Sequence, residues 1–223
     1  MVDLAAPGQP RAYIRRRGRM TAGQTRARDM LGQFCVADVS ELRSPEGIFG
    51  RQAPLGLEIG FGMGQALLEW ATARPDWNLL GLEIYAPGTG ALLLGIERLE
   101  LANLRALEVP AEVALQDGLL PASLDEIRIF FPDPWPKARH HKRRLIQPAF
   151  VALLAERLRP GGRLWLATDW APYAEWMQTV LGGEPRLVAD TAPATARVET
   201  RFEARGRRLG HGITDLVYRR MSD

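Results

Sequence analysis

From residue 55 onward, short apolar segments alternate with longer segments in which apolar residues recur every three or four positions. The short segments are typical of buried strands and the longer ones of amphipathic helices. Strands separated by helices pair in parallel through right-handed crossovers. The alternation predicts an α/β, Rossmann-like fold on a doubly wound, mostly parallel seven-stranded sheet. We expect strands at 55–59, 78–84, 104–109, 127–131, 163–168, 186–189 and 213–218, and helices at 65–73, 86–101, 147–158 and 172–181.

The chain of 223 residues is long enough for one hydrophobic core, so we expect a single domain over residues 23–223. Residues 1–22 are expected to form a basic, flexible N-terminal arm. A short helix is expected within residues 23–34. The Gly- and Pro-rich residues 44–54 indicate a loop, and Pro160-Gly161-Gly162 is expected to end the preceding helix.

The composition excludes several classes of protein. The chain has no run of eighteen apolar residues, so no membrane span is expected. Its basic start has no apolar block behind it, unlike a secretory signal. The single cysteine, Cys35, excludes an internal disulfide framework and a multi-cysteine zinc site. We therefore expect a cytoplasmic protein with no metal.

The positive charge is unevenly distributed, although the net charge is only +3. Residues 11–28 hold seven arginines and no acid, and further basic clusters lie at 137–144 and 201–208. Such segregation favours a polyanionic partner such as RNA. A solvated tail with exposed helix faces is the alternative. We expect the Arg11–Arg28 segment to add nonspecific affinity for RNA.

The segment after the first strand indicates a cofactor site. It reads Glu58-Ile59-Gly60-Phe61-Gly62-Met63-Gly64-Gln65, and its glycines permit a tight turn close to a ligand. The third glycine of a dinucleotide fingerprint would fall at Gln65, so that match is imperfect. Glu58 suits a ligand with an ammonium group, such as S-adenosylmethionine. Glu83, after the second strand, can accept two ribose hydroxyls. An NAD site and a purely structural turn remain as alternatives.

A second segment indicates a nucleotide pocket. The fourth strand runs into Phe130-Phe131-Pro132-Asp133-Pro134-Trp135-Pro136-Lys137, where two prolines fix the backbone around Asp133. Trp135 offers a flat surface for a base, and Lys137 with the basic residues after it suits phosphates. A proline-rich turn with a core tryptophan is the alternative.

Two more acids can complete this pocket. Asp169 follows the fifth strand, where it can also serve as a helix N-cap. Glu203, in Thr200-Arg201-Phe202-Glu203, can accept hydrogen bonds from the edge of a base.

These motifs resemble the bacterial tRNA (guanine-N7-)-methyltransferase family. The resemblance covers most of the chain after about residue 12. It rests on E-I-G-F-G-M-G at 58–64, F-F-P-D-P-W at 130–135, R-H-H-K-R-R at 139–144, A-T-D-W at 167–170, T-R-F-E at 200–203 and R-L-G-H-G at 208–212.

The resemblance implies a class I methyltransferase fold, S-adenosylmethionine as cofactor and the variable-loop guanine of tRNA as substrate. It implies that Glu58 and Glu83 bind the cofactor and that Asp133 lies between cofactor and base. It also implies that the substrate is bound by Lys137, Asp169, Thr200, Arg201, Phe202 and Glu203. N7 of guanine already exposes a lone pair, so no base is needed, and we expect Asp133 to balance the charge that develops.

The sequence departs from the family at two positions. Pro110 stands where members commonly have an Asp against the adenine, so we expect Glu112 to replace part of that contact. Pro136 stands where a His is usual.

Three other functions remain open at this point. They are methylation of another nucleic-acid position, NAD-dependent oxidation, and RNA binding without catalysis. The pattern does not distinguish a monomer from a homodimer.

Overall fold

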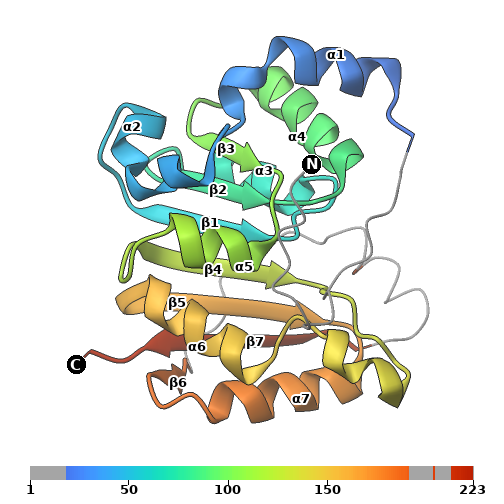
Figure 1. The fold of residues 1–223 in the computed structure, drawn as a ribbon, viewed down its shortest axis with the longest axis vertical. Coiled ribbons are helices and arrows are strands. Elements are labelled where there is room, and N and C mark those ends of the chain that lie inside the picture. The colour runs from blue at the N-terminus through green and yellow to red at the C-terminus, as the bar shows by residue number, and fades with distance from the viewer. Residues whose placement is uncertain (1–18, 191–202, 204–211, 223) are drawn as a thin grey trace.

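The computed structural model describes residues 19–190, 203 and 212–222. These residues form a seven-stranded sheet with the order β3-β2-β1-β4-β5-β7-β6 (Figure 1). The strands are β1 (Leu55–Ile59), β2 (Asn78–Leu82), β3 (Leu104–Leu107), β4 (Leu124–Phe130), β5 (Leu158–Thr168), β6 (Leu187–Ala189) and β7 (Thr214–Arg220). The strands β1 to β5 pair in parallel, and β7 is antiparallel to both β5 and β6. The predicted mostly parallel seven-stranded sheet is confirmed.

Helices cover both faces of the sheet. The α-helices are α1 (Ala22–Met30), α2 (Pro45–Phe49), α3 (Gln65–Ala73), α4 (Ala86–Leu99), α5 (Ala111–Val113), α6 (Pro148–Arg157) and α7 (Ala171–Gly182). Shorter turns are η1 (Gly32–Phe34), η2 (Val39–Arg43), the π-helical η3 (Ala114–Gly118) and η4 (Ala138–Arg143). In the described part of the chain, no helix is long and apolar enough to cross a membrane.

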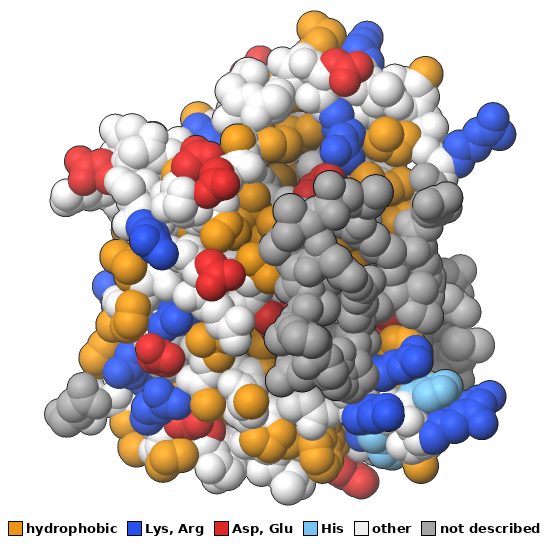
Figure 2. All heavy atoms as spheres, in the orientation of Figure 1, with side chains coloured by type: hydrophobic (Ala, Val, Ile, Leu, Met, Phe, Trp, Pro, Cys, Tyr) orange, Lys and Arg blue, Asp and Glu red, His pale blue; other side chains and the backbone are white. Residues whose placement is uncertain are grey.

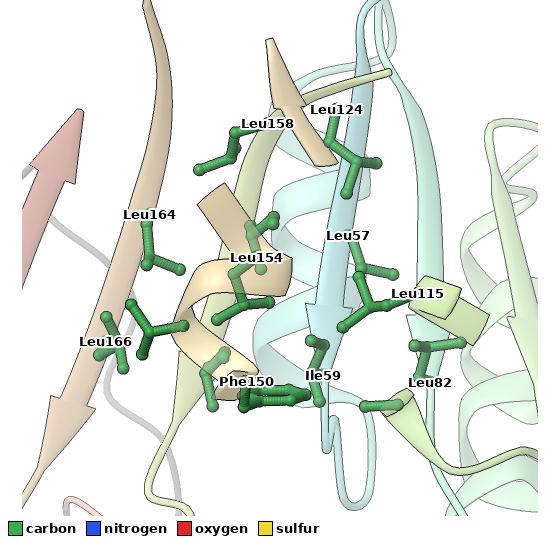
Figure 3. Close-up of a cluster of buried hydrophobic side chains, with 14 of the residues drawn as sticks. Leu57, Ile59, Leu82, Leu115, Leu124, Phe150, Leu154, Leu158, Leu164 and Leu166 are labelled. Atoms are coloured by element: carbon green, nitrogen blue, oxygen red, sulfur yellow. The ribbon is translucent and has the colours of Figure 1, made fainter. Parts of the chain in front are cut away.

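Side chains that alternate along β1 divide the core into two layers. Leu57 and Ile59 belong to one buried cluster with Phe150 and Leu154 of α6 (Figure 3). Residues of α1, α3 and α4 form a second cluster with β2 and β3. Successive strand residues point to opposite faces, so Glu58 points away from the layer that holds Ile59.

Residues 44–54 contain a helix, so the expectation of a loop there is wrong. Ser44 caps α2 by accepting a hydrogen bond from the Gly47 amide at 3.3 Å. Pro45 occupies the first turn, and Gly50 ends the helix in the left-handed region at φ 68°. This combination of Ser, Pro and Gly is a helix start and stop pattern that the composition of the segment obscured.

Residues Pro160-Gly161-Gly162 lie inside β5, so the expected strand start at residue 163 is wrong. The strand begins at Leu158, directly after α6. The pairing with β4 shifts register between Leu124 and Glu126, and Gly161 has a φ of 78°. A bulge of this kind absorbs residues that cannot join a regular ladder.

The first helix docks on the domain. Thr21 and Gln24 form a capping box, and the Gln24 side-chain amide donates to the Pro87 carbonyl at 3.1 Å. Arg28 forms two hydrogen bonds with the Glu108 carboxylate, at 2.6 and 3.0 Å. Arg28 is therefore tied to the domain, whereas RNA binding by the Arg11–Arg28 segment stays a prediction. Residues 1–18 of the expected arm lie outside the described residues.

Candidate active site

A cavity of about 230 Å³ lies at the carboxyl edge of the sheet. Such an edge, beside the strand where the order reverses, is where doubly wound sheets bind ligands. Its lining combines residues that follow β1, β2, β3 and β4, among them Gly60, Gly62, Glu83, Pro110, Glu112 and Asp133.

The glycines after β1 adopt a conformation that other residues rarely adopt. Gly60, Gly62 and Gly64 have φ values of 75°, 56° and 83°. Glycine adopts such values without the steric penalty of a side chain. The prediction of a tight glycine turn is confirmed, and this segment, residues 60–64, is the glycine loop.

Glu83 holds the glycine loop in place. Its Oε2 accepts a hydrogen bond from the Gly62 amide at 2.8 Å, and its Oε1 accepts from the amides of Ile84 and Tyr85 at 2.8 and 3.0 Å. Burial raises the pKa of the Glu83 carboxyl, and the three backbone hydrogen bonds oppose that rise. A carboxylate at the rim of the cavity keeps lone pairs that can accept hydroxyl groups of a ligand.

The wall after β3 is mostly apolar. Val109, Pro110 and Ala111 line the cavity, and Glu112 adds a carboxyl group beside them. Pro110 precedes α5 and has no N–H to offer a ligand. Within the described lining, Glu112 therefore supplies the carboxyl group of this wall.

Glu58 does not line the cavity, although it precedes the lining residue Ile59. Its side chain points to the face of the sheet opposite that of Ile59. Glu58 is in register with Arg128 of β4 and is only 3% exposed. Burial raises the pKa of Glu58 to about 7, and the positive charge of Arg128 opposes the rise. Within the described residues its Oε2 has no hydrogen-bond partner.

Arg128, which the sequence motifs do not single out, is a largely buried cation next to Glu58, with its side chain 14% exposed. Its guanidinium carbon lies 3.7 Å from the centre of the Trp70 ring and 5.2 Å from that of Trp165. Its Nε lies 2.6 Å from Oε1 of Glu126. The available signal was the pair Glu126 and Arg128, two positions apart and so on one face of β4, because charged residues are rare in a central strand.

Asp133 lies on the segment after β4, residues 131–135, which we name the proline loop. The side chain is exposed and lines the cavity that Glu83 also lines. The loop is strained, because Phe131 and Trp135 have φ values of 51° and 44°. Each such residue costs about 1–3 kcal/mol and persists only where its surroundings enforce it.

Trp135 is flanked by two residues of the basic cluster. Its ring meets the His140 ring edge-on, with the centroids 5.7 Å apart, and the Arg143 guanidinium carbon lies 5.1 Å from its centre. Lys137, Arg139, His141 and Lys142 are exposed. Figure 2 shows Lys, Arg and His side chains gathered on one corner of the molecule, over η4. This corner gathers exposed cations next to the proline loop.

Arg144 is an exception within the cluster, because it is only 4% exposed. The expectation that the whole cluster contacts phosphates is wrong for this residue.

The remaining predicted substrate residues lie outside the cavity lining or outside the described residues. Asp169 is half-buried, and the N-cap position of α7 belongs to Trp170, with no side-chain cap, so the alternative role of Asp169 as a cap is wrong. Glu203 is 5% exposed, and Thr200, Arg201 and Phe202 lie outside the described residues.

Comparisons with known proteins agree with this fold and site. Residues 52–216 match a family model described as "Putative methyltransferase". The aminoglycoside resistance methyltransferase NpmB1 aligns with a TM-score of 0.57 at 14% identity, over 82% of this chain and 94% of that chain. The 16S rRNA methyltransferase KamB aligns with a TM-score of 0.55 at 18% identity, over 82% of this chain and 92% of that chain. Fold and glycine loop together define a class I methyltransferase.

The sequence relatives narrow the class. The tRNA (guanine-N(7)-)-methyltransferase of Halorhodospira halophila is 49% identical over 99% of both chains. That of Burkholderia cenocepacia is 52% identical over 96% of this chain and 86% of the relative. The chain belongs to the tRNA (guanine-N7-)-methyltransferase family, as the sequence motifs predict.

Proposed function

We propose that this chain transfers the methyl group of S-adenosylmethionine to N7 of a guanine in tRNA, with the variable-loop guanine as its target. The observation that carries the proposal is one cavity shared by the glycine loop, Glu83 and Asp133. The names of the relatives support the reaction and the substrate.

The cavity suits the cofactor. The backbone of Gly60 and Gly62 leaves room for a close approach, and Glu83 can accept the ribose hydroxyls. We propose that the adenine lies against Val109 and Pro110, with Glu112 beside it. Glu58 would act on the cofactor only indirectly, because its side chain points away from the cavity that the donor enters. The donor supplies a methyl group that is activated by a positively charged sulfur.

The chemical step needs little help from a base. The N7 lone pair forms the new C–N bond while the C–S bond breaks, so the positive charge moves from sulfur to the guanine ring. No proton has to leave N7. Asp133 would orient the base and stabilise the charge that the ring acquires. Lys137, Asp169 and Thr200 to Glu203 would hold the guanine and its neighbours, and the exposed cations of η4 would contact phosphates. A tRNA substrate also favours a cytoplasmic location.

The decisive experiment measures methyl transfer from labelled S-adenosylmethionine to tRNA, followed by identification of the methylated nucleoside. We expect N7-methylguanosine. The Asp133→Ala variant should lose turnover by about 10²-fold or more, as for the loss of one charge-stabilising group. Asp76→Ala is a matched control, because Asp76 pairs with Arg74 on the surface. Near-normal turnover of Asp133→Ala would contradict the assigned role, and another methylated position would contradict the proposed reaction.

A second experiment tests Glu112. Glu112→Ala should weaken S-adenosylmethionine binding by about 3- to 10-fold, the worth of one hydrogen bond. Calorimetry measures the affinity, and Glu100→Ala, at the end of α4, is the control. An unchanged affinity would show that Glu112 does not replace the missing Asp.

A further inference from the structure

The basic cluster contains one arginine that faces the protein instead of solvent. Arg144 is 4% exposed, whereas its neighbours Arg139 and Lys142 are exposed. A cation that contacts phosphates from solvent needs an accessible guanidinium. The burial of Arg144 therefore calls for a different role.

The contacts of Arg144 point to the proline loop. Its Nε donates a hydrogen bond to the Pro134 carbonyl at 3.0 Å. Its guanidinium carbon lies 4.9 Å from the centre of the Tyr173 ring, on α7. One side chain thus connects the residue after Asp133 to a helix of the core.

The Tyr173 end of this connection is held by hydrogen bonds between α7 and Ile146. Tyr173 is fully buried, and its hydroxyl accepts a hydrogen bond from the Ile146 amide at 3.2 Å. The Trp176 indole N–H donates to the Ile146 carbonyl at 2.7 Å. Both backbone groups of Ile146, two residues beyond Arg144, are therefore held by α7.

The proline loop needs such support. Its two left-handed residues, Phe131 and Trp135, flank Asp133, and neither is a glycine. A backbone in that state relaxes unless contacts from outside the loop maintain it. The Pro134 carbonyl, between Asp133 and Trp135, is the point at which Arg144 acts.

We infer that Arg144 is a positioning residue, which holds Asp133 in the cavity by tying the Pro134 carbonyl to Tyr173 of α7. It acts through the loop and not through a phosphate of the substrate. The inference deepens the proposed function and rests on it for the role of Asp133.

The test compares Arg144→Gln with Arg139→Gln, the same substitution at an exposed position of the cluster. Turnover at saturating tRNA, KM, and the salt dependence of tRNA binding are measured for each. Arg144→Gln should lower kcat by about 10-fold or more, because small displacements of reacting groups are costly. Its salt slope should equal that of the wild type. Arg139→Gln should instead raise KM and reduce the salt slope by about 1.

Two further variants serve if Arg144→Gln does not fold. Arg144→Lys keeps the charge but lacks the planar group that stacks on Tyr173, so its kcat should fall with an unchanged salt slope. Tyr173→Phe releases the Ile146 amide and should lower kcat by a smaller factor. Wild-type kcat in folded Arg144→Lys or Arg144→Gln would overturn the inference, as would a reduced salt slope with kcat maintained.

Hydrogen exchange separates this inference from the proposed function, because it needs no catalysis. The amides of residues 131–143 should exchange at least about 10-fold faster in Arg144→Gln or Arg144→Lys than in Arg139→Gln. Equal exchange would overturn the inference. If the loop exchanges as expected but the wild type methylates no tRNA, the proposed function fails while the connection through Arg144 stands.

Discussion

The glycine loop and the proline loop both cross the carboxyl edge of the sheet, and both contain left-handed residues. In the glycine loop these are Gly60, Gly62 and Gly64, which adopt such angles without penalty. In the proline loop they are Phe131 and Trp135, which do not. The first loop is therefore specified by its own residues, whereas the second depends on Arg144 and α7.

The two loops also differ in the titratable residue that lies near each. Glu58, before the glycine loop, has a pKa raised by burial to about 7. Tyr173, behind the proline loop, has a pKa raised to about 12, chiefly by burial and to a smaller extent by the charge of Asp133. Of these two groups, only Glu58 should change its protonation state near neutral pH.

The largest effect that can sharpen this comparison is the pH dependence of stability. The folded chain keeps a proton on Glu58 between pH 4.5 and 7, whereas the unfolded chain has released it. The free energy of unfolding should therefore fall as the pH rises through this range, by up to about 3 kcal/mol. Glu58→Gln, which cannot ionise, should remove this slope in urea unfolding between pH 5 and 8.

Glu97→Gln is the control for this measurement, because Glu97 is exposed on α4. It should keep the wild-type slope. A Glu58→Gln protein with that same slope would show that Glu58 is already ionised at pH 5.

A smaller effect should come from the close approach of α4 to the glycine loop. A Cβ at Gly88 would lie 2.2 Å from the Gly62 carbonyl oxygen. Gly88→Ala should therefore displace the loop, destabilise the fold by about 1–3 kcal/mol and weaken cofactor binding. Thermal unfolding and calorimetry measure the two quantities.

Gly182→Ala, at the end of α7, makes the same substitution where no atom lies within 4 Å. It should have little effect. If Gly88→Ala binds cofactor as well as Gly182→Ala does, the glycine loop does not depend on the position of α4.

The smallest effect on stability should come from the ion pair next to the cavity wall that follows β3. Arg28 ties α1 to Glu108, two residues before Pro110, and both side chains are 31% exposed. Arg28→Gln should cost about 1 kcal/mol or less, as is usual for partly exposed ion pairs. Arg26→Gln, exposed on the same helix, should be neutral. Equal denaturation midpoints for the two variants would remove any role for this ion pair.

The regular elements near the glycine loop could be predicted from the sequence almost to the residue. The strand at 55–59 and the helix at 65–73 have the predicted bounds, because local periodicity determines both. The orientation of Glu58 was not predicted, because the sequence assigned this residue to the cofactor, and only the structure shows that its neighbour Ile59 is the one that lines the cavity.

The supports of the proline loop could not be predicted in this way. Arg144 belongs to a run of basic residues, and no local pattern distinguishes it from Arg139. Its burial depends on Tyr173, which lies 29 residues further along the chain. The strain at Phe131 and Trp135 was equally hidden, because neighbouring prolines suggest an ordinary rigid turn.

The position of β7 has a consequence for how the protein is made. This strand follows the other six in chain order, yet it lies between β5 and β6. While a ribosome is still synthesising residues 214–220, the backbone groups along the outer edge of β5 have no strand to pair with, and β6 has no place in the sheet. The sheet is therefore completed only after this segment has been made, and until then the outer edge of β5 exposes backbone groups that can pair with other chains.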